Sequence, residues 1–111
     1  MSLVEAALAA VEAVGGDAYL DADVACEALA ACEVLARLAG RPGYQNAYTE
    51  SVDDWVAAHA DLAVPPALVA RATAVIDRVL GERSELAELW DEGDGAPWRA
   101  TVDDLRRRVT G

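Results

Sequence analysis

Apolar residues recur at helical spacing along most of this chain, and glycine and proline separate the apolar segments. The longest segment, Val24 to Ala39, leaves only a narrow polar stripe on a helical projection. A helix that is apolar over most of its circumference is surrounded by other helices. We therefore predict a central helix near residues 23–39, capped by Asp21 or Asp23 and ended by Gly40. The residues left to face outward are Cys26, Ala30, Glu33 and Arg37.

The segment before the central helix carries a shorter apolar stripe. A first helix is predicted from Leu3 to Val14, where Gly15 and Gly16 stop it. The residues expected along its apolar side are Leu3, Ala7, Val11 and Val14. In the linker that follows, Tyr19 and Leu20 are expected to point inward.

The segment after the central helix begins with a polar loop and a short helix. Ser51, with Asp54 at the third helical position, resembles a capping box in which Asp replaces Glu. The residues that this short helix is expected to bury are Val52, Trp55 and Val56. Leu62 is expected to anchor the next loop.

Proline and serine mark the starts of the last three predicted helices. Pro65 and Pro66 open a helix that ends at Leu80, Ser84 caps a short fifth helix, and Pro97 opens the last one. The residues predicted to face the core from these helices are Leu68, Ala72, Val75, Ile76 and Val79, then Leu86, Leu89 and Trp90, then Trp98, Val102, Leu105 and Val109.

These patterns predict an all-α fold. No alternating strand pattern of useful length is present, and an alanine-rich chain without phenylalanine favours helix over strand. A chain of 111 residues is large enough for one modest core. We predict that residues 1–111 form a single-domain bundle of five or six helices around the central helix.

The charge of the chain narrows the classes of partner. The formal net charge is −11, and all nine cationic residues are arginines. Such a surface repels phosphate backbones and anionic membranes, so we expect no nucleic-acid binding and no membrane association. It is compatible with a basic protein partner or a divalent cation. A solvated acidic surface that maintains solubility is the simplest alternative.

Two cysteines and the N-terminal residues bear on the compartment. Cys26 and Cys32 share the predicted central helix, ~9 Å apart along its axis and on roughly opposite faces, so we expect free thiols. No basic segment of a signal peptide is present at the N-terminus, and no apolar run approaches the roughly 20 residues of a membrane span. These features favour a cytoplasmic protein.

The only histidine and the clustered aspartates offer little chemistry. Asp54 and Asp61 are near enough in sequence to orient His59 as a base, but no local motif places a nucleophile beside it. A histidine near a helix C-terminus is more often a favourable cation there. Asp17, Asp21 and Asp23 lack the spacing of a calcium loop and fit helix capping better. Two cysteines and one distant histidine do not make a zinc site.

The strongest candidate for catalysis is a cluster of glutamates. Glu85, Glu88 and Glu92 share one helical face, and paired glutamates on helices can hold Mg²⁺ against a nucleotide phosphate. Such a site needs a second carboxylate pair on a facing helix, and Glu27 and Glu33 point in different directions. A solvated helix face is therefore favoured over a metal site. We accordingly assign no catalytic, cofactor or metal residues, and keep the three glutamates as the candidates for an alternative hydrolase.

Five segments of the chain together resemble a bacterial family catalogued as domain of unknown function 4259. They are ALAACEVLARLAGRPG (28–43), VDDWVAAH (52–59), ALVARATAVIDRVL (67–80), SELAELW (84–90) and WRATVDDLRRRV (98–109). Members of that family typically begin with a segment like MGAWGxGxFxNDDAxDW, which this chain lacks, so we expect a shortened or divergent member. The resemblance implies a bacterial, cytoplasmic helical protein and carries no known activity over to any residue.

The sequence thus favours a non-enzymatic protein-interaction module with an acidic surface, without a cofactor and acting as a monomer or homodimer. A protein that blocks a basic partner, such as an immunity protein, is one concrete form. The alternative is a Mg²⁺-dependent nucleotide hydrolase that uses Glu85, Glu88 and Glu92.

Overall fold

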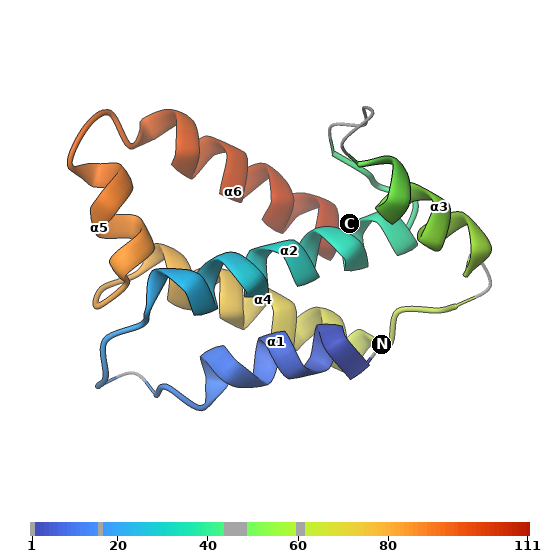
Figure 1. Ribbon diagram of the computed structural model, residues 1–111, viewed down its shortest axis with the longest axis horizontal. Coiled ribbons are helices and arrows are strands. Elements are labelled where there is room, and N and C mark those ends of the chain that lie inside the picture. The colour runs from blue at the N-terminus through green and yellow to red at the C-terminus, as the bar shows by residue number, and fades with distance from the viewer. Residues whose placement is uncertain (1, 16, 44–48, 60–61) are drawn as a thin grey trace.

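The computed structural model describes residues 2–15, 17–43, 49–59 and 62–111 (Figure 1). Within these ranges the chain forms six helices and no strand, which confirms the predicted all-α bundle. The helices are α1 (Ser2–Glu12), α2 (Ala22–Leu38), α3 (Glu50–Ala58), α4 (Pro66–Leu80), α5 (Glu85–Asp91) and α6 (Ala96–Thr110).

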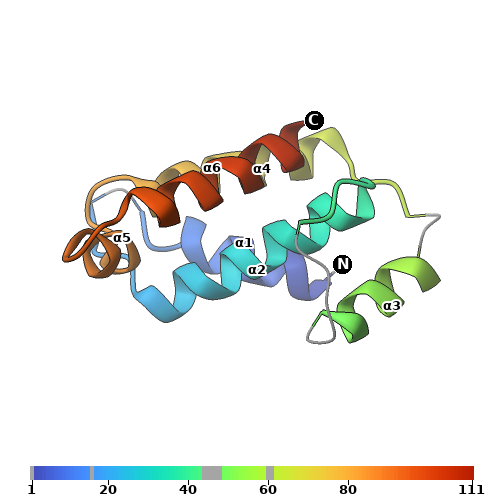
Figure 2. The same cartoon turned by 90° about the horizontal axis from the view of Figure 1, so that it is seen from above.

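The central position of α2 is confirmed by its neighbours. It makes substantial contact with each of the other five helices. Helices α1, α2, α4 and α6 run along the long dimension of a body of 38 × 28 × 22 Å, and α5 closes one end (Figure 1). Helix α3 lies at the other end and projects away from the bundle (Figure 2).

The ends of α2 follow the predicted capping chemistry. The Oδ1 atom of Asp21 accepts a hydrogen bond from the backbone N–H of Asp23, which identifies Asp21 as the N-cap. Gly40 has φ +80°, and the N–H of Arg41 donates to the carbonyl oxygen of Ala36. A left-handed residue with this bond closes the helix in a Schellman motif, so glycine is required here for a conformational reason.

The core is formed by the stripes of four helices. All five residues predicted for α4 are buried, as are Val102, Leu105 and Val109 of α6. In α1 the buried residues are Val4, Leu8 and Val11, whereas Leu3 is 86% exposed, so its predicted burial was wrong. Leu3 precedes Val4 by one residue, which turns it about 100° away from the core-facing side.

The short helix α3 forms as predicted, but its predicted N-cap, its predicted buried residues and the predicted anchor of the next loop were wrong. Thr49, rather than Ser51, occupies the N-cap position, and its hydroxyl donates to Oδ2 of Asp53 over 2.9 Å. None of the α3 residues is buried, and Val52 and Trp55 are each 37% exposed. Leu62 is exposed as well. The residue of this loop that packs against the core is Val64, which is partly buried.

The linker between α1 and α2 is attached to the start of α5. The N–H of Leu20 donates to the carbonyl oxygen of Arg83 over 2.7 Å, and the N–H of Glu85 donates to that of Leu20 over 2.9 Å. Leu20 and Ser84 are both fully buried at this junction. Two segments that are distant in sequence are therefore held side by side at one end of the bundle.

Candidate functional site

A polar cluster joins α2, α3 and α6 at the end of the molecule where α3 lies. The Arg37 guanidinium donates to Oε1 of Glu33 over 3.2 Å and forms an ion pair with Asp53 of α3. Arg108 of α6 donates to Oε2 of Glu33 over 2.7 Å, and the N–H of Gly43 donates to Oε1. The prediction that Glu33 and Arg37 face solvent was therefore wrong: both side chains are turned into this cluster, and that of Arg37 is only 4% exposed. Their charges are used to hold three helices together.

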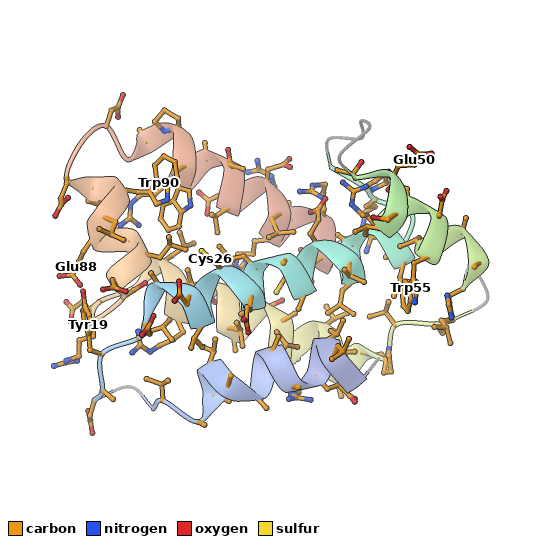
Figure 3. All side chains as sticks on the ribbon, in the orientation of Figure 1. Tyr19, Cys26, Glu50, Trp55, Glu88 and Trp90 are labelled. Atoms are coloured by element: carbon orange, nitrogen blue, oxygen red, sulfur yellow. The ribbon has the colours of Figure 1, made fainter. Side chains whose placement is uncertain are left out.

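The three glutamates proposed as metal ligands do not converge on one point. Oε1 of Glu85 accepts a hydrogen bond of 2.8 Å from the backbone N–H of Ala22, at the first turn of α2. Glu88 accepts one from the hydroxyl of Tyr19, and the two side chains lie together at the outer edge of the molecule (Figure 3). Glu92 follows the last turn of α5 as its C-cap and is exposed. Within the described ranges no three histidine, cysteine or acidic side chains form a group able to hold a metal ion.

The contact between Tyr19 and Glu88 alters the chemistry of the phenol. The hydrogen bond and the negative charge of the carboxylate both disfavour the phenolate, and together with desolvation they raise the pKa of Tyr19 to about 12. Tyr19 is 54% exposed, so the prediction that it points inward was wrong, whereas Leu20 is buried as expected.

His59 is engaged with a neighbouring aromatic side chain rather than with Asp54. Its ring stacks on Trp55 with centroids 4.2 Å apart, and Nδ1 lies 2.8 Å from the carbonyl oxygen of Trp55. His59 occupies the C-cap of α3, the location predicted for a cation at a helix terminus. Asp61, the other predicted neighbour, lies outside the described residues.

The two cysteines are free and lie on opposite sides of α2, as predicted. Cys26 is exposed, whereas Cys32 is fully buried with its Sγ atom 3.9 Å from the carbonyl oxygen of Ala72. Burial raises the pKa of the Cys32 thiol to about 12, because the thiolate would lose its hydration. Cys32 therefore behaves as a small core residue, and Cys26 has the more accessible thiol.

The second turn of α5 presents large apolar side chains to solvent. Leu86 and Ala87 in the first turn are buried, but Leu89 and Trp90 are 52% and 48% exposed, so their predicted burial was wrong. Helix α5 crosses the end of the bundle, and only its first turn reaches the core (Figure 1). The one sequence signal for this outcome is the shortness of the helix between Ser84 and Gly93.

Trp90 is held in place by side chains of α6. Its ring lies parallel to that of Trp98 at a centroid distance of 6.1 Å. The guanidinium of Arg99 lies 5.9 Å from the Trp98 ring centroid and donates to Asp91 over 2.7 Å. Trp98 is partly buried against the core as predicted, so the exposed ring rests on a fixed support.

Acidic residues outnumber arginines in the segments around this apolar surface. Residues 17–27 and 82–94, which meet at the α5 end, contain ten acidic residues and one arginine. Arg78 and Arg99 reach into the same end from α4 and α6. Arg78 donates to the carbonyl oxygens of Ala18 and Glu82, so its contacts fasten the two loops together. We call the exposed surface of residues 17–27 and 82–94 the acidic end.

Three arginines outside this end form ion pairs with carboxylates of other turns or helices. The ion pairs Arg71–Glu12, Arg106–Asp77 and Arg108–Asp104 each have N–O distances of 2.8–2.9 Å. Counted with Arg78 and Arg99, the acidic end has ten acidic residues against three arginines, whereas the rest of the chain has ten against six, so the larger part of the negative excess lies at the acidic end.

A family model described as a domain of unknown function, DUF4259, matches residues 1–101. The chain belongs to this family. The match confirms the resemblance found in the sequence and extends from α1 into α6. No curated protein and no solved structure matches the chain. Among the described residues, no helix has the length and apolar content required to cross a membrane.

Proposed function

We propose that this protein is a non-enzymatic interaction module that binds a basic protein partner. The observation that carries the proposal is the charge of the acidic end. Ten acidic residues lie there with only three arginines, when Arg78 and Arg99 are counted. An uncompensated charge of one sign accelerates and orients the approach of a partner of the other sign. The same field opposes nucleic acids and anionic lipids.

Contacts of the carboxylates support a binding role over a hydrolytic one. Glu85 is committed to the N-terminus of α2 and Glu88 to Tyr19, so neither is oriented toward a common ion. A two-carboxylate metal site requires side chains that point to one position. The two free thiols are compatible with a reducing compartment, so we place the module in the cytoplasm of a bacterium, as a monomer or homodimer.

Salt-dependent binding to a basic partner tests the proposal. The full chain is immobilised, bacterial proteins are captured at low salt, and each purified basic candidate is measured by calorimetry at two salt concentrations. We expect binding that weakens with salt and weakens further in the variant Glu88→Gln/Glu92→Gln. The matched control, Glu50→Gln/Asp54→Asn, removes two acidic side chains from α3 and should leave the affinity unchanged.

Two results would overturn the proposal. The first is equal loss of affinity in both double variants, which would mean that only the net charge matters. The second is a melting temperature that rises when Mg²⁺ is added with a nucleotide, accompanied by nucleotide turnover, which would favour the hydrolase.

A further inference from the structure

The second turn of α5 is the place where apolar exposure and negative charge coincide. Leu89 and Trp90 are each about half exposed, and Glu88 and Glu92 adjoin them in the chain. Protein interfaces are enriched in tryptophan, and their most energetic residues are aromatic side chains at the centre of a patch. We call Leu89 and Trp90 the α5 apolar patch.

The patch is preorganised for contact. Trp90 stacks in parallel on Trp98, at an interplanar angle of 4°, and the Arg99 guanidinium beside Trp98 is held by Asp91 and by the carbonyl oxygen of Leu80. A ring fixed by its neighbours loses little conformational freedom when a partner covers it. Its exposed face is therefore available to a partner without rearrangement of α5.

Charge complementarity decides what covers the patch. A second copy of this chain would bring the same carboxylates against Glu88 and Glu92, and like charges facing each other oppose association. A purely apolar segment would leave those carboxylates without counter-charges as they lose water. A segment with apolar side chains on one side and lysine or arginine on its flanks satisfies both requirements.

We propose that the α5 apolar patch docks an amphipathic, basic segment of a partner protein, with its apolar side on Leu89 and Trp90 and its cations on Glu88 and Glu92. This inference rests on the proposed function and adds to it the location of the site and the pattern of the ligand. Leu89 and Trp90 provide affinity through buried apolar area, and the two glutamates provide orientation.

The test uses three synthetic peptides and the full chain. The probe is an 18-residue helical peptide of leucine and lysine with one apolar side, and the controls are its sequence-scrambled form and an oligolysine of equal length. Affinity is measured by calorimetry for the parent protein, for Leu89→Ser/Trp90→Ser and for the matched control Val52→Ser/Trp55→Ser. The control pair lies on α3 and is also exposed.

We expect the amphipathic peptide to bind most tightly, and to lose about tenfold in affinity in the α5 variant but not in the α3 variant. Circular dichroism of each variant checks that the helices are retained, and the single variant Leu89→Ser, which keeps the Trp90–Trp98 stack, should still weaken binding several-fold. Equal affinity for all three peptides, or equal loss in both double variants, would overturn this inference.

The results also separate this inference from the proposed function. If Glu88→Gln/Glu92→Gln weakens binding of the peptide while Leu89→Ser/Trp90→Ser does not, the acidic end binds basic partners and the docking site is wrong. If no basic peptide binds the parent protein at low salt, the proposed function itself fails.

Discussion

Helices α4 and α3 both carry apolar side chains at helical spacing, but the molecule uses them differently. The stripe of α4 is entirely buried, because α1, α2 and α6 all pack around it. None of the α3 side chains is buried, and among the described helices α3 has substantial contact only with α2. An amphipathic pattern therefore identifies the side of a helix that is suited to burial, but burial also requires neighbours on that side.

The two helices are also held by different forces. Helix α4 is attached through Ile76, Val75 and other fully or nearly fully buried side chains. Helix α3 is attached to α2 through the ion pair between Arg37 and Asp53. We expect the stability of the whole domain to depend on the first kind of contact, and the local stability of α3 to depend on the second.

The largest effect is expected from truncation in α4. Ile76→Ala should lower the free energy of unfolding by about 3 kcal/mol, because it removes a fully buried side chain and leaves a cavity. The matched change in α3, Val52→Ala, should cost less than about 0.5 kcal/mol. Urea denaturation followed by circular dichroism measures both, and similar losses would show that α3 is part of the cooperative core.

A smaller effect is expected from the ion pair that attaches α3. Arg37→Ala should lower the local stability of α3 by about 2 kcal/mol, because Glu33 and Asp53 lose the buried cation that they share. Hydrogen exchange should show faster exchange across α3 while the amides of α4 stay protected. Arg106→Ala, which removes the exposed pair with Asp77, is the control and should leave both helices unchanged. Uniform loss of protection in both helices after Arg37→Ala would contradict a local role.

A still smaller effect is expected from the N-cap at the start of α5. Ser84 is fully buried, and its Oγ atom accepts a hydrogen bond from the N–H of Ala87. Ser84→Ala should lower the free energy of unfolding by about 1 kcal/mol, because an N-cap acceptor is lost. Thermal or chemical denaturation measures this loss. Ser84→Asp restores an acceptor but places a charge in a buried position, so it should not recover stability. Full recovery by aspartate would show that the junction is hydrated.

The smallest effect is expected at alkaline pH, at the exposed edge of α5. The pKa of Tyr19 is about 12 in the folded protein, above its usual value of 10, so the hydrogen bond to Glu88 contributes fully below pH 10. That contribution is lost as the pH rises from 10 to 12. Tyr19→Phe should therefore be slightly less stable than the parent below pH 10, and the difference should disappear toward pH 12. A difference that stays constant over this range would exclude the hydrogen bond as its cause.

Local chemistry made much of the fold predictable from the sequence. Asp21 and Ser84 cap α2 and α5 because their short side chains can accept from the first free N–H groups, and Gly40 ends α2 because it tolerates positive φ. The stripes of α4 and α6 were predicted residue by residue, since their 3.6-residue periodicity determines which side chains share a face. Residues of the candidate site were less predictable, since the exposure of Leu89 and Trp90 depends on where the short α5 lies.

The sequence by itself determined which segments are helical, where most of them begin and end, and which side of the longer helices is apolar. Only the tertiary structure decided which apolar sides have neighbours and which charges meet. The buried Arg37 is paired with Asp53, sixteen positions later in the chain, and the partly buried Glu33 is paired with Arg108, 75 positions later. Trp90 and Trp55 remain exposed because their helices lie at opposite ends of the bundle. The physical reason is that periodicity is a property of neighbouring residues, whereas burial and ion pairing depend on residues that only folding brings together.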